Sequence, residues 1–550
     1  MRKNNILTTL LYAICGFLCA LPFILNDLWF LTWIAYIPIL INEWKREEDK
    51  DKPYKKAWLR GLAFFFPFGV TTFYWIVELY PMDFVGFTPF IAFIVVTMGI
   101  TLLPLFQALF TSFNIVFLCF LKRNRVKQWM YPLAAGAMWI FQEWLQTLTW
   151  AGVPWSKLAI GQMSMLQNVQ SASLFGSYFV SFIIITTAGY LALFLINMKQ
   201  KDTRKRAMIF ACTALLIFSS NFAYGLINLN FTAQPTSEFK AAAIQGNIET
   251  EDKWGEDTYG SMDVHKELLL QAAQEGADLV VFSETAFPFD IAYDFIEEYI
   301  NDMSNQSQVD FIIGCFTHDG PEGYNSTVLV TKDNGITDEV YIKQKLVPFG
   351  EFVPMKSIIN TVLPFMSEMS QLGGELIPGT DSVVFDTRYG KVGSLICFDS
   401  IYETVALDSV NNGAEILAIS TNDSWFHDSA ATYQHNAAAR LRAIELDRYV
   451  IRSGNTGISA IINNKGEIIK KLDVLQEGYV LDTVKTYNTR TLYSCVGNII
   501  ILAAFIFMII LSIRLRIKTK KIKDREERAR SINAFNEARY GNSYKKSKKK

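Results

Sequence analysis

The chain has 550 residues, of which 51% are hydrophobic and 19% are charged, a composition that excludes an intrinsically disordered protein. Its 52 Lys and Arg residues nearly balance its 53 Asp and Glu residues, so the net charge of -1 gives no reason to expect nucleic-acid binding by the whole chain. The length exceeds what one soluble core usually organises, and seven cysteines are too few for a disulfide scaffold.

Apolar stretches dominate the first part of the chain, and a membrane-crossing helix needs roughly 20 such residues. The eight predicted spans cover residues 6–25, 28–42, 58–78, 88–120, 129–148, 172–197, 207–228 and 491–513. The fourth stretch is long enough for two helices, but one span keeps the basic segment that follows it on the same side as the others. Between residues 229 and 490, charged residues and glycine become frequent and short β-rich runs appear, which predicts a soluble domain.

Basic residues gather in alternate loops, and such loops are retained on the cytoplasmic side of a membrane. The basic segments are Arg2 and Lys3, 45–56, 122–127, 199–206 and the tail 514–550. With eight spans this alternation is consistent, so we expect the N-terminus and the tail inside and the soluble domain outside.

Three β-rich runs in the soluble domain end at a reactive side chain. The run ADLVVFSETAFP presents Glu284, VYIKQKLVPFGEFVP presents Lys343 and Lys345, and KVGSLICFDSIYE presents Cys397. A thiolate can attack a carbonyl while a carboxylate moves protons and an ammonium favours the thiolate and stabilises the oxyanion. Each residue alone has a simpler explanation, as Cys315 in DFIIGCFTH illustrates for an inert core cysteine.

Six sequence words between residues 239 and 484 resemble the nitrilase superfamily: AAIQGNI, FSETAFP, KLVPFGEFVP, ICFDSIYE, STNDSWF and SGNTGISAI. With seven spans before them, one after them and AGVPW at 151–155, the resemblance narrows to the apolipoprotein N-acyltransferase family of bacterial inner membranes. It implies an α-helical membrane domain (1–228), an α/β nitrilase-like αββα sandwich (229–490), an eighth helix (491–513) and a basic cytoplasmic tail (514–550).

The same resemblance implies roles for individual residues. Glu284 becomes the general base, Lys343 the oxyanion stabiliser and Cys397 the nucleophile, with Lys345 as the alternative lysine. Glu351 resembles an additional active-site acid that orients Lys343 or shares its charge.

The residues that flank the triad depart from the family in one place. Phe398 and Asp399 stand where the family commonly has Tyr and Glu, which leaves the backbone amide of residue 398 available for an oxyanion hole. Whether the departure alters contacts with the acceptor stays an open question at this point. Trp254 is either a substrate-loop residue or an aromatic domain anchor. Asn422 and Trp425 either line the pocket or hold the strand end near Cys397.

No cofactor or metal is expected. The histidines His265, His318, His427 and His435 lack ligand spacing, and neither a metal motif nor a phosphate loop is found.

The family resemblance implies a two-step acyl transfer. A phospholipid donates an acyl chain to the thiol, and the thioester then acylates the α-amine of a diacylglyceryl-cysteine lipoprotein. We expect a monomer in the bacterial inner membrane, with its catalytic domain on the periplasmic face and no nucleic-acid partner.

Two other function classes are alternatives to the acyl-transfer hypothesis. One is a membrane-tethered nitrilase-type hydrolase of small amides, with water as the acceptor. The other is a non-enzymatic transporter or scaffold, which the intact triad disfavours. Glu143 is the main charge within the spans, which lack the paired charges of an ion-coupled route.

Overall fold

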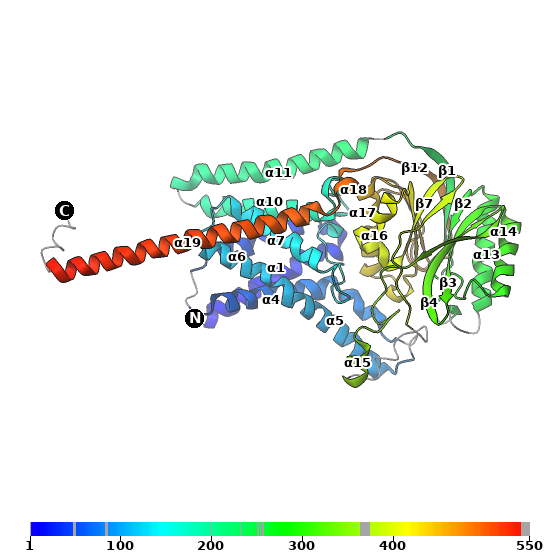
Figure 1. Ribbon diagram of the computed structural model, residues 1–550, viewed down its shortest axis with the longest axis horizontal. Coiled ribbons are helices and arrows are strands. Elements are labelled where there is room, and N and C mark those ends of the chain that lie inside the picture. Colours follow the sequence, from blue (N-terminus) through cyan, green and yellow to red (C-terminus); the bar gives the residue numbers. More distant parts are fainter. Residues whose placement is uncertain are drawn as a thin grey trace.

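The computed structural model describes residues 2–47, 51–82, 86–199, 201–231, 233–249, 252–253, 255, 258–362 and 375–540. Two parts follow one another along its long axis, a bundle of helices and a β-sandwich (Figure 1). The chain enters the sandwich after α11, and it returns to the bundle through α18 and α19.

Helices make up the first part. They are α1 (Arg2–Ala20), α2 (Leu31–Ile34), α3 (Ile37–Lys45), α4 (Pro53–Thr72), α5 (Pro89–Thr111), α6 (Phe113–Arg123), α7 (Met130–Leu145), α8 (Leu166–Val169), α9 (Ala172–Phe175), α10 (Ser177–Asn197) and α11 (Arg204–Asn230). Short 3₁₀ turns lie between them at Leu21–Phe23, Asn26–Leu28, Tyr74–Leu79, Ile160–Gln162 and Lys201–Thr203. After the sandwich come α18 (Leu492–Val496) and α19 (Ile499–Tyr540).

Within the described residues, five helices are long and apolar enough to cross a membrane by length and composition. They cover Ile6–Phe23, Pro89–Arg123, Ser177–Asn197, Lys201–Asn230 and Ile499–Arg539. Three of the eight predicted spans coincide instead with the broken pair α2 and α3, with α4, which carries Lys55, Lys56 and Arg60, and with the 16-residue α7. The number of eight spans therefore stays a prediction, while the apolar helices identify a membrane protein.

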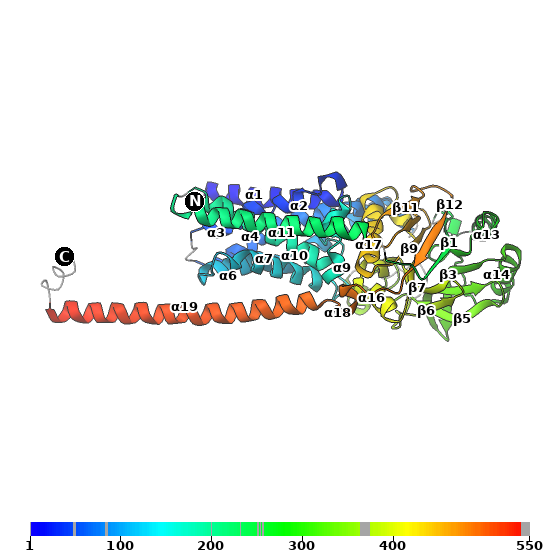
Figure 2. The ribbon, with the colours of Figure 1, turned by 90° about the horizontal axis from the view of Figure 1, so that it is seen from above.

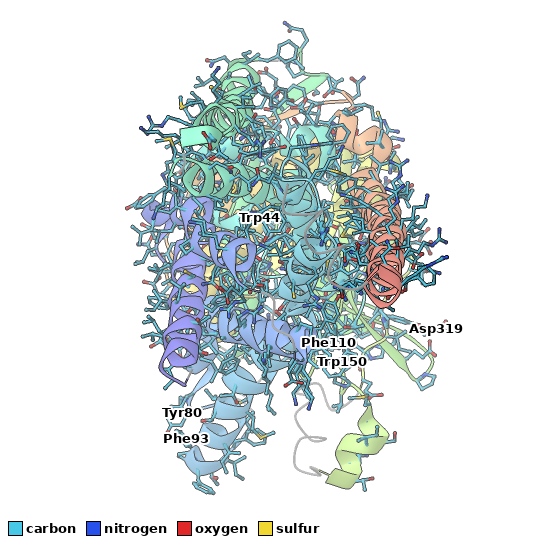
Figure 3. The ribbon with its side chains drawn as sticks, turned by 90° about the vertical axis from the view of Figure 1, so that its left-hand side faces the viewer. Trp44, Tyr80, Phe93, Phe110, Trp150 and Asp319 are labelled. Atoms are coloured by element: carbon cyan, nitrogen blue, oxygen red, sulfur yellow. The ribbon has the colours of Figure 1, made fainter. Side chains whose placement is uncertain are left out.

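The outer surface of the bundle carries many large apolar side chains. Phe93 on α5 is 62% exposed, and Figure 3 shows Phe93 and Tyr80 at the edge of the molecule. Leu215 and Leu216 on α11 are 66% and 65% exposed. Surfaces of this kind are stable against lipid rather than water.

The last helix continues well past the predicted span 491–513. α19 is 42 residues long and reaches Tyr540, and it extends beyond the other helices (Figure 2). Its apolar first part packs against α7, where Phe141 and Phe505 stack with ring centroids 5.4 Å apart. Its basic second part extends away from the sandwich.

Two six-stranded sheets form the sandwich. The first has the order β12-β1-β2-β3-β4-β5 and the second β11-β10-β9-β8-β7-β6. The strands are β1 (Ser237–Gln245), β2 (Leu279–Val281), β3 (Asp310–Asp319), β4 (Glu322–Thr331), β5 (Gly335–Ile342), β6 (Val384–Thr387), β7 (Gly390–Ile396), β8 (Ile416–Thr421), β9 (Val450–Gly454), β10 (Ala460–Ile462), β11 (Ile468–Lys471) and β12 (Gly478–Thr486). The pairs β1–β2, β2–β3, β7–β8 and β8–β9 are parallel.

Helices cover the outer face of each sheet. α13 (Thr258–Gln274) and α14 (Asp294–Ser307) cover the first, while α16 (Glu403–Asn411) and α17 (Ala430–Leu446) cover the second and face the membrane helices (Figure 1). Short helical segments also occur at α15 (Lys356–Val362), η8 (Cys397–Ile401) and η9 (Ser424–Phe426).

Both faces of the central strands are buried, which explains their unbroken apolar sequences. In β1, Ala241 and Ala243 belong to the core between the sheets, whereas Ala242 and Ile244 belong to the core beneath α13 and α14. Successive side chains of a strand point to opposite faces, so one β-rich run supplies both layers.

The sandwich rests directly on the membrane part. On α17, the Gln434 amide donates to the Phe23 carbonyl oxygen over 2.8 Å, and Glu445 accepts from the Ser177 amide at the start of α10 over 2.8 Å. Both Gln434 and Glu445 are buried. The second sheet and its helices are therefore positioned by the bundle.

Candidate active site

The ends of three strands deliver the three triad residues predicted from the sequence. Glu284 lies just beyond β2, Lys343 directly follows β5, and Cys397 directly follows β7 at the start of η8. Because the two sheets pack face to face, strand ends from both sheets meet at one place. Cys397 has a φ of 48°, in the left-handed region that a non-glycine residue rarely adopts, so the chain turns sharply at this residue.

Lys343 is the centre of a buried ionic cluster. Its ammonium lies 2.7 Å from Glu284 Oε1 and 2.9 Å from Glu351 Oε2. The Asn325 amide donates to both acids, to Glu284 Oε1 and Glu351 Oε1, each over 2.8 Å. The Asn422 backbone amide donates to the other Glu284 oxygen over 3.0 Å. Every hydrogen bond here is charge-assisted, which fixes the orientation of both carboxylates.

Burial and charge set the protonation states of the cluster. Burial alone would raise the pKa of the Glu284 carboxyl, but Lys343 outweighs it and holds that pKa below its usual value. Burial likewise opposes the charge on Lys343, yet Glu284 and Glu351 hold the pKa of its ammonium well above its usual value. Glu284 is therefore an ionised carboxylate at neutral pH, ready to accept a proton.

Burial has the largest effect on the protonation state of the Cys397 thiol. Burial, followed by the nearby Glu284 charge, raises the pKa of the thiol, and Lys343 only partly offsets this. Lys343 lowers the pKa of the thiol, as expected of an ammonium that favours the thiolate, but burial and the Glu284 charge outweigh it. The Cys397 thiol is therefore neutral at neutral pH.

The turn at Cys397 is held by a second buried network. The Cys397 carbonyl oxygen accepts from Ser400 Oγ over 2.8 Å and lies 3.1 Å from His435 Nε2. His435 Nδ1 lies 2.8 Å from Asp423, whose other oxygen accepts from Arg452 over 2.6 Å. This network holds the backbone at Cys397.

Potential metal-ligand atoms of Cys397, Asp423 and His435 lie within 4.8 Å of one another. Both nitrogens of His435 are already in hydrogen-bonding contacts, and the Arg452 guanidinium pairs with Asp423. These contacts explain the cluster as a support for the turn.

Asp399 lies between the Lys343 segment and the Cys397 turn. Its Oδ1 accepts from the backbone amide of Lys345 over 2.8 Å, and its Oδ2 accepts from the Tyr341 hydroxyl over 2.7 Å and the Ile396 amide over 3.1 Å. It is fully buried, and burial raises the pKa of its carboxyl to about 6. Asp399 therefore ties the Lys343 segment to the Cys397 turn.

Phe398 faces the membrane part. It stacks on Trp155 of the AGVPW segment with ring centroids 6.3 Å apart, and Trp155 also lies 5.6 Å from the His435 ring. The residue after Cys397 is thus in contact with a loop of the bundle.

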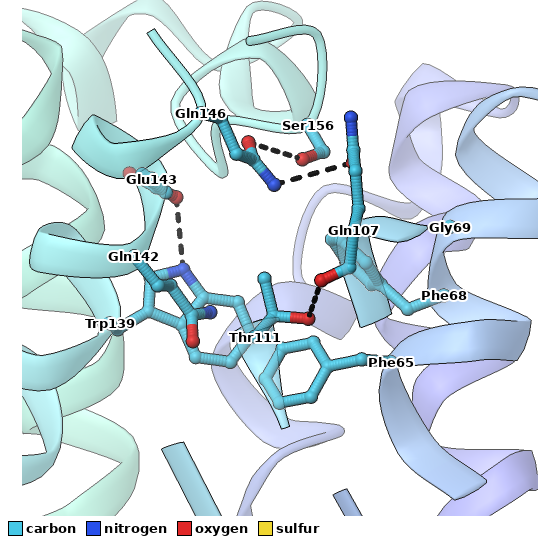
Figure 4. Close-up of a pocket in the computed structure, with 10 residues that line it drawn as sticks. All are labelled: Phe65, Phe68, Gly69, Gln107, Thr111, Trp139, Gln142, Glu143, Gln146 and Ser156. Carbon is cyan, nitrogen blue, oxygen red and sulfur yellow. Dashed lines mark hydrogen bonds between the residues drawn. The ribbon is translucent and has the colours of Figure 1, made fainter. Parts of the chain in front are cut away.

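Polar side chains of the bundle hold the AGVPW loop in place. Gln107 on α5 donates to the Gly152 carbonyl oxygen over 2.6 Å. Glu143 on α7 is almost fully buried and accepts from the Leu158 amide over 3.0 Å. Figure 4 shows these side chains around a cavity of about 10 Å³, lined by Phe65, Phe68, Gly69, Gln107, Thr111, Trp139, Gln142, Glu143, Gln146 and Ser156. Glu143 therefore anchors a loop.

Two of the three candidates for substrate contact lie at the end of β8. Asn422 contacts Glu284 through its backbone, and its side-chain oxygen accepts from Asn455 over 3.2 Å, so it holds the strand end. Trp425 is partly exposed beside that strand end. Trp254 lies outside the described residues.

Sequence reasoning missed two residues of the site. Asn325, which bridges both acids, lies in the β-rich run YNSTVLV, where an asparagine is unusual enough to be a signal. Lys253 is buried and donates to the Glu284 carbonyl oxygen over 2.8 Å, and burial lowers the pKa of its ammonium to about 8. Its acidic neighbours in the sequence are typical of a solvated segment, so nothing marked it.

Two known protein families match this chain. Residues 15–190 match the "Apolipoprotein N-acyltransferase N-terminal domain", and residues 240–492 match "Carbon-nitrogen hydrolase". The first match covers most of the helical bundle, and the second covers the sandwich.

Known relatives extend over nearly the whole length. An apolipoprotein N-acyltransferase of Rickettsia typhi is 28% identical over 93% of this chain and 98% of its own length. The enzyme of that name from Geobacter metallireducens is 27% identical over 89% of this chain and 92% of its own length.

Solved structures resemble part of the chain. Nit3 of Saccharomyces cerevisiae, a member of the nitrilase superfamily, is 17% identical over 48% of this chain and 96% of its own, with a TM-score of 0.37. A Nesterenkonia amidase is 15% identical over 48% of this chain and 95% of its own, with a TM-score of 0.36.

Proposed function

The chain belongs to the apolipoprotein N-acyltransferase family, and on that premise we propose that it moves an acyl chain from a phospholipid to the α-amine of a diacylglyceryl-cysteine lipoprotein. The reaction proceeds through a thioester on Cys397. The observation that carries the proposal is the buried cluster in which Lys343 pairs with Glu284 and Glu351 beside the Cys397 turn.

In the first step the Cys397 sulfur attacks the carbonyl carbon of a phospholipid ester. Glu284 accepts the thiol proton, which agrees with an ionised carboxylate next to a neutral thiol. The Lys343 ammonium and the backbone amide of residue 398 stabilise the negative oxygen of the tetrahedral intermediate. The ester bond then breaks, and the lysophospholipid alkoxide leaves with the proton held by Glu284.

In the second step the lipoprotein amine attacks the thioester carbon. Glu284 accepts a proton from the amine, the C–S bond breaks, and an amide forms. The proton returns to sulfur and regenerates the thiol. A thioester is reactive enough to acylate an amine and persists only where water is excluded, as the burial of Cys397 favours.

The membrane part supports a lipid substrate. The loop that stacks on Phe398 comes from the bundle, so the nucleophile's neighbour is positioned by a membrane segment. Following the basic loops, we place the sandwich on the periplasmic face of a bacterial inner membrane and expect a monomer. Both substrates are anchored in lipid, so the pocket must open near the interface.

Intact mass spectrometry of the full chain after mixing with phospholipid tests the proposal. Wild type is expected to gain the mass of one acyl chain, and Cys397→Ala is expected to gain none. An active wild type without any acyl adduct would overturn the covalent mechanism.

The second half of the reaction needs its own measurement. After removal of excess phospholipid, a synthetic diacylglyceryl-cysteine peptide is expected to take the acyl chain and return the enzyme to its original mass. Release of free fatty acid instead, or cleavage of small soluble amides without peptide acylation, would assign the protein to membrane-tethered hydrolases.

A further inference from the structure

A second cavity lies at the junction of the sandwich and the bundle, and the proposed reaction does not use it. Its volume is about 140 Å³, and since about 10–15 Å³ suffices for one water molecule, it has room for a small polar group. Its lining residues are Asn26, Met163, Ser164, Tyr433, Asn436, Ala437, Arg440, Ile458, Ile468 and Lys471. We name it the junction cavity.

The junction cavity and the nucleophile lie on opposite sides of α17. Tyr433, Asn436, Ala437 and Arg440 follow the spacing i, i+3, i+4, i+7, so they share one face of the helix. His435, which contacts the Cys397 carbonyl oxygen, lies on the opposite face. A ligand in the junction cavity is therefore separate from one at Cys397.

The junction cavity carries cationic side chains. Two cationic side chains line it, Arg440 from α17 and Lys471 from β11. Arg440 donates through Nε to the Gly466 carbonyl oxygen over 2.7 Å, and no carboxylate in the described part of the chain forms an ion pair with it. Lys471 forms an ion pair with Asp473, but its side chain stays 45% exposed. Glu467 lies near enough to Arg440 to offset part of the effect that burial has on the pKa of the guanidinium. A guanidinium with free donors next to a cavity fits an anion with several oxygens.

An unpaired polar group supports a ligand at this place. The side-chain oxygen of Asn436 is buried and has no hydrogen-bond partner among the described residues. A buried amide left without a partner is costly, and a bound polar group would satisfy it. The amide presents either its oxygen or its two N–H donors, depending on its flip.

The junction cavity lies next to the end of a predicted membrane-crossing helix. Asn26 lies three residues after the apolar span Ile6–Phe23, so the cavity borders the end of a predicted membrane-crossing helix. Phospholipid headgroups lie at this level. Beside Asn26, Leu25 and Phe30 are 52% and 42% exposed, which suits contact with acyl chains below the headgroup.

From these observations we propose that the junction cavity binds a phosphate group, that of a phospholipid headgroup, at a site separate from Cys397. Arg440 and Lys471 bind the phosphate oxygens, and the Asn436 amide completes the contact. Soluble phosphate shares this chemistry, so the experiment must distinguish the two sources.

Native mass spectrometry of the full chain in detergent, titrated with diether phosphatidylglycerol, tests the site. This lipid has no acyl ester, so it cannot be a donor, and the result is independent of the proposed transfer. Ala437→Met keeps every charge and fills the cavity, and it is expected to remove one bound lipid. Lys471→Gln is expected to weaken that binding about tenfold, the effect of one lost charge-assisted contact.

Lys470→Gln is the matched control. It makes the same change of charge one residue earlier on β11, where the side chain points to the opposite face of the strand. It is expected to bind lipid as wild type does. Equal lipid binding by wild type, Ala437→Met and Lys471→Gln would overturn the proposal, and so would an equal loss in Lys470→Gln.

A competition arm identifies the source of the phosphate. The lipid that wild type binds and Ala437→Met does not is the one followed. If it stays bound in millimolar inorganic phosphate, the result supports a headgroup site. Displacement of that lipid by inorganic phosphate contradicts the headgroup assignment.

Discussion

The Lys157 ammonium forms a buried ion pair with the Glu403 carboxylate and so joins the AGVPW loop of the membrane part to the start of α16. Glu403 follows Cys397 by only six residues. The same carboxylate accepts from the Tyr178 hydroxyl over 2.8 Å and from the Asn498 amide over 3.1 Å. One acid of the sandwich is thus bound by three separate segments of the bundle, close to the proposed nucleophile.

Loss of one partner of this ion pair is expected to be costly. Lys157→Met leaves Glu403 buried without its ion-pair partner, and breaking a buried ion pair typically costs about 3–5 kcal/mol of unfolding free energy. Chemical denaturation in detergent measures the effect. The control, Lys266→Met, breaks an ion pair with Asp302, whose side chain is 49% exposed, and is expected to cost less than about 1 kcal/mol. Equal losses in the two variants would contradict a special role for the buried pair.

Glu403 also predicts a pH dependence of stability. Burial opposes its charge, but Lys157 and Arg442 outweigh burial and lower the pKa of the carboxyl from 4.5 to about 2. A depressed folded-state pKa means that the stabilisation is present above pH about 4.5 and is lost as the pH falls toward 2, by about 3 kcal/mol. Between these pH values, the unfolding free energy is expected to change less with pH in Glu403→Gln than in wild type. An equal change of the unfolding free energy with pH in both proteins would show that Glu403 does not contribute to the pH dependence of stability in this range.

Asn325→Asp tests the electrostatics of the proposed catalytic cluster. A third carboxylate next to Glu284 and Glu351 raises the pKa of Glu284, which must be ionised to accept the thiol proton. We expect the rising limb of the rate–pH profile for thioester formation to shift to higher pH, with a rate near neutrality reduced about tenfold or more.

Asn334→Asp in the exposed turn between β4 and β5 is the matched control and is expected to keep the wild-type profile. An unshifted rate–pH profile in Asn325→Asp would contradict a role of Asn325 in setting the pKa of Glu284.

Gly152→Ala tests whether the AGVPW loop positions the site. A Cβ on Gly152 would lie 1.8 Å from the Gln146 carbonyl oxygen, so the loop must move, and Trp155 moves with it from Phe398. We expect thioester formation to slow about tenfold to a hundredfold, because small misplacements of a reacting group are costly.

Gly99→Ala in α5 serves as the control. Its added Cβ meets only the side chain of Ile76, at 3.2 Å, and it is expected to react at the wild-type rate. Normal activity in Gly152→Ala would mean that the loop does not position the nucleophile.

Local patterns in the sequence were enough to predict the apolar helices, a soluble domain between them and the strand ends that carry Glu284, Lys343 and Cys397, whereas the αββα architecture of that domain came from the family resemblance. Such features depend on the hydrophobicity of a segment and on the residues that follow it, and both are readable from a single chain. The choice of Lys343 over Lys345 came from the family resemblance. In the structure the Lys345 ammonium lies over the Tyr402 ring, 5.4 Å from its centroid, away from the acids.

Only the tertiary structure decided what surrounds the triad. Asn325, Lys253 and Asp399 act through partners far away in the sequence. Asn325 and Lys253 reach Glu284 only once the strands of the first sheet lie side by side. The bond from the Lys345 amide to Asp399 exists only once the two sheets are packed face to face. The pKa of Cys397 depends on burial and on charges from other strands, so no local pattern reports it. The contact of Lys157 with Glu403 spans 246 residues, and it forms because the fold places a membrane loop beneath the helix that follows the nucleophile.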